Sequence, residues 1–309
     1  MRVFHGVEAV PADWPVSAVT VGKFDGVHAG HRAVIAALEE LAGQHDAATV
    51  VVTFDRHPMA LVAPEKCPPT LVSLEQKIDL LAGTGVDATV VLRFDEALAT
   101  LTPVDFVEQI LVDALHARLV LVGQDFRFGH RGAGDVALLQ ELGGRFGFDV
   151  RLIDDVMPDQ QRRVSSTWIR ELLADGDVEA ATRLLGHEPE VRGMVVHGAA
   201  RGRELGYPTA NLSPESQGLI PADGVYAGWL TDAGVRYPAA ISVGNNPTFE
   251  GVPQKQVEAY VLDEDIDLYD HVVDVAFVER IRGMTAFTGI DPLIAQIADD
   301  VERVRRILE

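Results

Sequence analysis

The sequence predicts an α/β domain with a doubly wound parallel sheet over residues 1–186, followed by an antiparallel β-barrel domain with a C-terminal helix over residues 187–309. Two patterns predict this division. Up to about residue 155, short aliphatic segments without polar alternation take turns with segments of helical period, which is typical of parallel strands buried on both faces. After Gly186, short strand-like segments follow one another, with turn residues between them, until a final helical segment.

The first domain is expected to alternate strands with helices and to bind ligands beyond the carboxyl ends of the strands. Its strand segments are rich in Val, Ile and Leu. The predicted strands are residues 18–21, 49–54, 89–92, 119–122 and 150–153. The predicted helices between them are residues 33–41, 74–81, 104–115 and 136–146. Two shorter helices, residues 167–173 and 178–185, follow and are separated by an Asp-Gly-Asp turn.

The second domain is expected to begin at His187-Glu188-Pro189, where the pattern changes from α/β to β. Its predicted strands are residues 190–196, 225–230, 237–242, 257–262 and 273–278. Residues 292–308 have helical period and are expected to close the barrel. A chain of 309 residues is long enough for each domain to bury its own core.

The composition excludes several classes of protein. The net charge of −21 is the opposite of what nucleic acids or anionic membrane surfaces require of a binding partner. Cys67 is the sole cysteine, so neither an intrachain disulfide nor a cysteine-rich zinc site is expected. The first ten residues lack the apolar core of a signal peptide, and no apolar segment approaches the roughly 20 residues of a membrane span. We expect a cytoplasmic protein.

Residues 22–31 are expected to bind phosphate. They lie between a predicted buried strand and an Ala-rich helix, and a helix N-terminus after a glycine-bearing turn binds anions through its free N–H groups. His28 and His31 are expected on one side of the first helical turn, where both imidazoles can donate to phosphate oxygens. Gly30 leaves room for a nucleotide beside the backbone.

Two other interpretations of the histidine pair remain open on spacing alone. The histidines can be exposed residues of a capped turn, or part of a metal site, which would need further ligands at matching positions. Their position directly after a buried strand favours phosphate binding. The GxxxxGK[ST] pattern of a P-loop does not occur in the sequence.

Residues 22–31 resemble the signature of nucleotidylyltransferases, whose His-x-Gly-His element binds the phosphates of ATP. The longer form, with Phe-Asp-Gly-Val-His at residues 24–28, is similar to the FAD synthetase module of prokaryotic bifunctional riboflavin kinase/FAD synthetases. The resemblance implies a Rossmann-like nucleotidyltransferase fold in which His28 and His31 are catalytic. It also implies ATP contacts at Gly22, Phe24, Asp25 and Gly30.

Residues 53–58, 123–129 and 164–170 agree with the same family. The resemblance implies flavin contacts at His57, Pro58 and Phe128. It implies ATP contacts at Asp125, Ser165, Ser166, Thr167 and Arg170. From the residues alone, the phenylalanines at 126 and 128 can stack on a flat ring or fill the core, and the three hydroxyl residues can cap a helix. Arg56 stands where the family usually has proline, so this flavin loop departs from the family's pattern.

Residues 198–211 form a glycine-punctuated segment with two arginines, a pattern that also fits a solvated turn. Its Pro-Thr-Ala-Asn string resembles the riboflavin kinase signature, which implies that Thr209 and Asn211 coordinate the Mg²⁺ of ATP. Neutral oxygens of this kind suit Mg²⁺, and glycines let backbone amides approach phosphate. The resemblance further implies ATP contacts at Gly202 and Arg203.

Residues 224–228, 242–249 and 257–263 also resemble riboflavin kinases. In the predicted strand, Val257, Ala259 and Val261 share one face, so Glu258 points to the other. A carboxylate there can take the proton from an attacking hydroxyl, or it can be an ordinary solvent-facing side chain. The resemblance implies that Glu258 is the base for the riboflavin 5′-hydroxyl. It implies flavin contacts at Asn246 and Arg282.

Two positions near the flavin side depart from the family: Asp270 stands where glycine is commoner, and Thr285 lies in a segment that usually carries glutamate. Three interpretations follow. The first is an enzyme that phosphorylates riboflavin to FMN and adenylylates FMN to FAD, with ATP as co-substrate. The second is an FMN adenylyltransferase with a weak or inactive kinase, and the third is a non-catalytic flavin-binding regulator. The two intact sets of predicted catalytic groups favour the first, because a regulator has no need of both.

Overall fold

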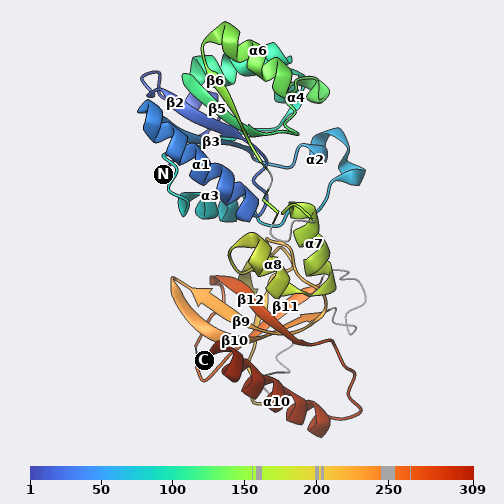
Figure 1. Ribbon diagram of the computed structural model, residues 1–309. Coiled ribbons are helices and arrows are strands. Elements are labelled where there is room, and N and C mark those ends of the chain that lie inside the picture. Colours follow the sequence, from blue (N-terminus) through green and yellow to red (C-terminus); the bar gives the residue numbers. More distant parts are fainter. Residues whose placement is uncertain (155, 158–161, 199–201, 203–204, 245–254, 265) are drawn as a thin grey trace. The chain divides into compact units, whose positions relative to one another are not determined.

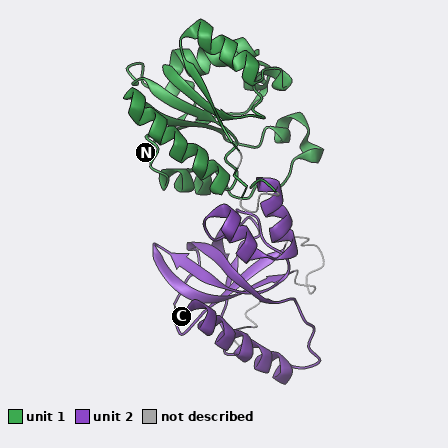
Figure 2. Ribbon diagram, viewed as in Figure 1, with its two compact units in different colours: residues 1–164 green, residues 165–309 purple. Residues whose placement is uncertain are grey.

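The computed structural model describes residues 1–154, 156–157, 162–198, 202, 205–244, 255–264 and 266–309. The chain divides into two compact units, Met1–Val164 and Ser165–Glu309, which we term the N-terminal and the C-terminal unit (Figures 1 and 2). The first contains a parallel α/β sheet, and the second contains a closed antiparallel barrel followed by a C-terminal helix. Both predicted fold classes are confirmed. No helix of the described residues is long and apolar enough to cross a membrane.

The sheet of the N-terminal unit has six parallel strands in the order β1-β4-β3-β2-β5-β6. The strands are β1 (Arg2–His5), β2 (Ser17–Val21), β3 (Ala48–Phe54), β4 (Ala88–Leu92), β5 (Ala117–Gly123) and β6 (Asp149–Ile153). Strand β1 was not predicted, because this edge strand has no fully buried residue and therefore no aliphatic run. The chain order reverses between β2 and β5, and in α/β sheets ligands bind at the carboxyl ends beside such a reversal.

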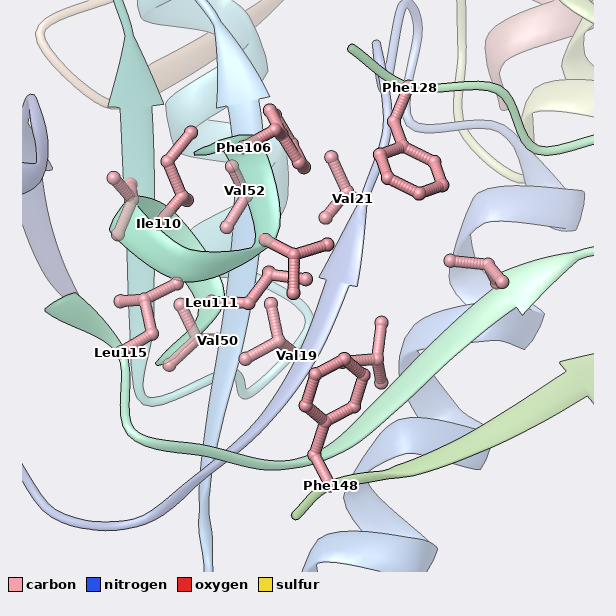
Figure 3. Close-up of a cluster of buried hydrophobic side chains, with 14 of the residues drawn as sticks. Val19, Val21, Val50, Val52, Phe106, Ile110, Leu111, Leu115, Phe128 and Phe148 are labelled. Atoms are coloured by element: carbon pink, nitrogen blue, oxygen red, sulfur yellow. The ribbon is translucent and has the colours of Figure 1, made fainter. Parts of the chain in front are cut away.

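Helices cover both faces of this sheet (Figure 1). They include α1 (Ala29–His45), α3 (Leu74–Ala82), α5 (Pro103–Phe106), the π-helical η3 (Val107–Ala114) and α6 (Val136–Phe146). Shorter pieces are η1 (Val7–Ala9), α2 (Met59–Val62), η2 (Pro64–Lys66), α4 (Glu96–Thr100) and η4 (His130–Gly132). Alternate residues of β2 and β3 pack against η3 in one buried cluster (Figure 3). Their neighbours pack against α1 and α3 on the other face.

The barrel of the C-terminal unit closes in the order β10-β11-β8-β7-β12-β9, with every pair antiparallel. Its strands are β7 (Glu190–Val196), β8 (Ala210–Leu212), β9 (Gly224–Asp232), β10 (Val235–Gly244), β11 (Gln256–Val261) and β12 (Val272–Arg282). The C-terminal helix α10 (Ile290–Leu308) packs Val301 and Val304 against the barrel. Strand β8 was not predicted, because it has three residues and lies within the glycine-punctuated segment.

Helices α7 (Ser166–Asp175) and α8 (Val178–Leu185) belong to the C-terminal unit by their contacts. The boundary predicted from the sequence, at His187, places residues 165–186 in the first domain instead. The physical reason for the difference is that α8 packs on β12, and that the backbone N–H of Ala222 donates to the carbonyl of Leu173 at 2.8 Å. Arg280 on β12 also donates from Nη1 to the carbonyl of Asp175 at 2.9 Å.

Candidate active sites

The predicted phosphate-binding loop joins β2 to α1 at the point where the strand order reverses. Its backbone is held in an uncommon conformation, because Phe24 has φ 50° and Val27 has φ 39°. A β-branched residue with positive φ is costly, and such strain persists only where the surrounding structure imposes it. The surrounding fold therefore holds the loop in this conformation at the carboxyl end of the sheet, where a ligand is expected to bind.

The two histidines lie against each other at the start of α1. His28 is the N-cap, and its Nδ1 accepts a hydrogen bond from the backbone N–H of His31 at 3.3 Å. The imidazole rings stack with their centroids 3.7 Å apart and an interplanar angle of 14°. Because His28 Nδ1 is an acceptor, a neutral His28 carries its proton on Nε2 and can donate from there. A Cβ on Gly30 would lie 3.1 Å from the His28 ring, which explains the glycine.

Burial keeps both imidazoles neutral at pH 7. His28 is 6% exposed, and burial lowers its pKa to about 4, with the positive charge of Arg163 acting in the same direction. Burial also lowers the pKa of His31 well below the ordinary value, and His28, Lys23 and Lys77 lower it further. Neutral imidazoles can donate hydrogen bonds, but they bring no positive charge to a bound anion.

Three of the expected ATP-contacting residues shape this loop. Asp25 is 8% exposed, and its Oδ1 accepts a hydrogen bond from the backbone N–H of Leu71 at 2.8 Å. Phe24 is 2% exposed, and its ring lies 4.9 Å from the ring of His31. A Cβ on Gly22 would approach the Phe24 ring to 2.9 Å. These three positions hold the loop against α1 and the segment before α3.

The segment after β5 places a carboxylate and a buried ring. Asp125 accepts a hydrogen bond on Oδ2 from Arg163 Nη1 at 2.8 Å. Phe128 is 5% exposed and packs in the core, with ring centroids 5.6 Å from Phe126 and 5.8 Å from Phe106 (Figure 3). The expected flavin contact at Phe128 thus falls on a ring that presents almost no surface to a ligand. Phe126, which is partly buried, is the more accessible of the stacked pair.

The segment after β3 is held by local hydrogen bonds. His57 Nδ1 accepts from the backbone N–H of Met59 at 3.1 Å, and Pro58 is the N-cap of α2. Arg56, which replaces the family's usual proline, lies 3.5 Å from Asp55 and is exposed. The turn into α2 therefore forms with arginine at this position.

In the C-terminal unit, Ser165 caps α7, as predicted, by accepting from the backbone N–H of Trp168 at 3.3 Å. Ser166, Thr167 and Arg170 lie in the first turns of this helix.

The metal-site interpretation of His28 and His31 gains no support, because the part of the chain that the structure describes contains no group of three or more His, Cys, Asp or Glu placed to hold a metal.

The barrel brings together the three predicted kinase residues. Glu258 on β11 pairs in register with Asn211 on β8, so their side chains stand on the same face. Thr209 Oγ1 donates to Glu258 Oε2 at 3.5 Å. Asn211 Nδ2 donates to the carbonyl and to Oγ1 of Thr209 at 3.1 and 3.3 Å. Val257, Ala259 and Val261 are buried on the opposite face, as the sequence predicts.

A pocket of about 310 Å³ adjoins this cluster and is lined by Thr209, Asn211, Tyr269 and neighbouring residues. One lining residue, Gly198, has no room for a side chain, because a Cβ there would lie 2.5 Å from the Asn211 side chain. In the segment before Thr209, a Cβ on Gly202 would lie 2.3 Å from the carbonyl of Tyr207. The expected ATP contact Arg203 and the expected flavin contact Asn246 lie outside the described residues.

Arg282, expected to contact flavin, is held by the C-terminal helix. Its Nε lies 3.0 Å from both carboxylate oxygens of Asp300, and its Nη2 donates to Asp300 Oδ2 at 2.7 Å. Nη1 donates to the carbonyl of Gly283 at 3.1 Å. Asp300 is 4% exposed and the Arg282 side chain is partly exposed, so this ion pair is a largely buried attachment of α10 to β12.

Sequence reasoning missed Lys77, a buried lysine on α3 beside the histidine loop. A signal was present: in the predicted helix 74–81, Lys77 lies three positions after Leu74 and four before Leu81, so it occupies the apolar face of the helix. A charged residue on a buried face is uncommon and indicates a specific partner.

Comparisons with known proteins identify both units. The family model for FAD synthetase matches residues 10–168, and the family model for riboflavin kinase matches residues 185–308. The protein of Escherichia coli (strain K12) named bifunctional riboflavin kinase/FMN adenylyltransferase is 38% identical over 301 residues, which cover 97% of this chain and 95% of that protein. A protein of the same name from Listeria monocytogenes is 36% identical over a match that covers 93% of this chain and 91% of that protein.

A solved structure covers almost the whole chain as well. The crystal structure of a protein from Streptococcus pneumoniae named Macrolide-efflux Protein is 32% identical and has a TM-score of 0.86, with 98% of each chain covered. Both family models, the near full-length relatives and this structure agree on the order of the two units. The chain belongs to the family of bifunctional riboflavin kinase/FMN adenylyltransferases.

Proposed function

We propose that this chain converts riboflavin to FMN and FMN to FAD, with ATP as the co-substrate of both reactions. The observation that carries the proposal is that one chain holds two separate sets of reactive groups. The stacked neutral histidines lie at the strand-order reversal of the N-terminal unit. The Thr209, Asn211 and Glu258 cluster lies beside a pocket of the barrel.

Adenylylation is assigned to the histidine loop. A phosphate oxygen of FMN attacks the α-phosphorus of ATP, and pyrophosphate leaves. His28 Nε2–H and His31 donate hydrogen bonds to the oxygens on which negative charge accumulates, an effect that a buried site strengthens. Gly22, Gly30 and Asp125 are assigned to ATP binding. The ATP contacts expected at Ser165, Ser166, Thr167 and Arg170 stay a prediction, which rests on the ability of a capped helix N-terminus to bind anions.

Phosphorylation is assigned to the barrel. The riboflavin 5′-hydroxyl attacks the γ-phosphorus of ATP, ADP leaves, and Glu258 takes the hydroxyl proton. The donor set of Thr209 and Asn211 fits Mg²⁺, because the Asn211 amide donates from Nδ2 to Thr209 and so presents Oδ1 as an acceptor. When bound there, Mg²⁺ would neutralise charge on the transferring phosphate.

The test separates the two reactions within one molecule. Incubation with riboflavin, ATP and Mg²⁺, followed by chromatography of the flavins, is expected to show FMN first and FAD later. His28→Ala should slow FAD formation by about 10²-fold or more while FMN formation continues, because one donor to the transition state is lost. Glu258→Ala should slow FMN formation and leave conversion of added FMN to FAD intact.

His45→Ala is the matched control, because His45 lies exposed on the same helix as His31. It should leave both rates unchanged. Equal loss of both activities in His28→Ala or in Glu258→Ala would contradict the assignment of one reaction to each unit. A folded parent protein that forms neither flavin nucleotide would contradict the proposed function itself.

A further inference from the structure

Lys77 is a charged side chain buried at the carboxyl edge of the sheet. It is 8% exposed, and its Nζ donates to the carbonyl of Phe54 at 2.7 Å and reaches the carbonyl of Lys23 at 3.4 Å. Phe54 is the last residue of β3, and Lys23 lies in the loop directly after β2. One ammonium on α3 therefore joins the ends of two adjacent strands.

The Lys23 carbonyl is where the histidine loop leaves the sheet. It also accepts a hydrogen bond from Thr53 Oγ1 at 3.1 Å, so Thr53 and Lys77 hold the same atom. The next residue, Phe24, has positive φ, as does Val27, and α1 begins directly after the N-cap His28. A loop in this conformation relaxes unless its ends are fixed, and Lys77 fixes the end that precedes both histidines.

Lys77 also places positive charge beside His31. Its charge contributes to the lowered pKa of His31, so the two groups lie within electrostatic range. Since both histidines are neutral at pH 7, they bring no net charge to the phosphates. In a protein with a net charge of −21, a fixed cation behind the loop is therefore a distinct contribution to ATP binding.

We propose that Lys77 is a positioning residue for adenylyl transfer, which holds the histidine loop through the carbonyls of Lys23 and Phe54 and supplies positive charge behind His31. The inference rests on the proposed placement of that reaction at His28 and His31. In this proposal Lys77 contacts neither ATP nor FMN. It acts by fixing the histidine loop and through the electrostatic field of its positive charge.

The protonation state of Lys77 gives the inference a specific readout. Burial lowers the pKa of Lys77 to about 8, while Asp25 of the loop and Asp55 after β3 oppose that shift. Lys23 of the loop and Lys77 both lie within electrostatic range of His31, which is neutral at pH 7. A cation that is required in its protonated form supports activity below its pKa, and this activity is lost as the pH rises through that value.

The experiment uses the full chain and compares Lys77→Met and Lys77→Arg with Lys66→Met. Lys66 lies exposed on η2 of the same unit, so its variant removes the same charge from the surface. FAD formation from added FMN is measured at limiting ATP from pH 6 to 9.5, with riboflavin phosphorylation and thermal unfolding followed on the same preparations.

Lys77→Met is expected to lower kcat/KM of FAD formation by about 10²-fold and to leave FMN formation at the parent rate. The parent should lose activity as the pH rises through about 8. Lys77→Arg should retain more activity than Lys77→Met and should move this decline to higher pH, because a guanidinium stays protonated there. Lys66→Met should behave like the parent.

Two results would overturn the inference: a folded Lys77→Met with the parent's kcat/KM, or a Lys77→Arg whose alkaline decline stays at the parent's pH. If Lys77→Met does not fold, the comparison of the parent with Lys77→Arg decides. His28→Ala, measured in parallel, separates the two proposals. If His28→Ala leaves FAD formation unchanged, the placement of the reaction is wrong. If His28→Ala slows FAD formation and Lys77→Met does not, only the role of Lys77 is refuted.

Discussion

Burial sets the chemistry of the two histidines and links it to the stability of the N-terminal unit. His28 has a pKa of about 4 in the folded chain, and an unfolded chain titrates near the ordinary value of about 6.5. Between these values the unfolded state binds more protons than the folded state. Neutral His28 therefore stabilises the fold above about pH 6.5, and this contribution is lost as the pH falls toward 4.

The first prediction at this scale is a loss of stability in mild acid. From pH 7 to pH 5, His28 alone should lower the free energy of unfolding by about 2 kcal/mol. Trp14 lies in the N-terminal unit, so urea unfolding can be followed by its fluorescence in a Trp168→Phe, Trp229→Phe background. His28→Asn keeps an N-cap residue and removes the titrating group, so the free energy of unfolding of this variant should fall less between pH 7 and pH 5. A variant with the parent's pH dependence would contradict this assignment.

Asp270 shows why one departure from the family's pattern is tolerated. It has φ 64°, the left-handed region in which glycine is favoured, and aspartate is among the few other residues that adopt it. Its backbone N–H donates to the carbonyl of Val195 at 3.0 Å, so the turn before β12 is formed. The departure therefore concerns the backbone of this turn, and Thr209, Asn211 and Glu258 stay assembled beside it.

At the scale of elements, the irregular pairing of β12 determines which groups Arg280 and Arg282 contact. The register of β12 against β9 shifts between Phe277 and Glu279 and again between Arg280 and Arg282. Such bulges re-aim side chains, and here Arg280 bonds to the carbonyls of Asp175 and Asp223, while Arg282 bonds to Asp300.

The second prediction is that Asp300 stabilises the attachment of α10. Asp300→Ala should lower the free energy of unfolding of the C-terminal unit by about 3 kcal/mol, because removal of one partner leaves a largely buried charge uncompensated. Asp299→Ala is the matched control, since Asp299 is exposed on the same helix. Chemical denaturation of the full chain checks this. If Asp300→Ala changes only the KM for riboflavin, Arg282 serves the flavin and not the helix.

The sequence predicted regular elements well where the apolar pattern is long. Residues 136–146, 178–185 and 190–196 match α6, α8 and β7 to the residue. It missed β1, which is short and has no buried residue, and β8, which at three residues is too short for a pattern. It also gave no sign of the bulges in β12, because a bulge depends on the partner strand and not on local composition.

The residues of the candidate sites also differ in how far local sequence predicts their contacts. Thr209 and Asn211 are neighbours in the chain, and a motif sufficed to connect them. Glu258 joins them through the pairing of β8 with β11, a register that local sequence does not encode. The burial of Phe128 and the bonding of Arg282 to Asp300 arise from packing between distant segments, which a local sequence pattern does not show. The flavin contacts expected at both residues stay predictions.

At the scale of the whole molecule, α7 and α8 raise the question of where the two halves separate. The family models leave residues 169–184 between their matches, and the contacts of these helices lie with the barrel. Four residues of α8 are buried, Val178, Ala181, Leu184 and Leu185. We propose that the autonomous kinase unit begins at Ser165.

The last prediction compares two fragments. A fragment of residues 165–309 should fold alone and phosphorylate riboflavin at the parent's rate, because it keeps its core and the bond from Arg280 to the carbonyl of Asp175. A fragment of residues 187–309 should be less stable by at least about 3 kcal/mol, since it exposes the surface that α8 covers. Urea unfolding and FMN formation check both fragments.

In the longer fragment, Glu258→Ala should abolish most turnover while ATP and riboflavin still bind, because a general base acts on the chemical step and not on ground-state affinity. Glu215→Ala is the control, since Glu215 is exposed on the same unit. Equal stability of the two fragments would show that α7 and α8 are not part of the kinase unit. A Glu258→Ala fragment that phosphorylates riboflavin at the parent's rate would show that the proton goes to another group, although Glu258 lies 3.5 Å from Thr209.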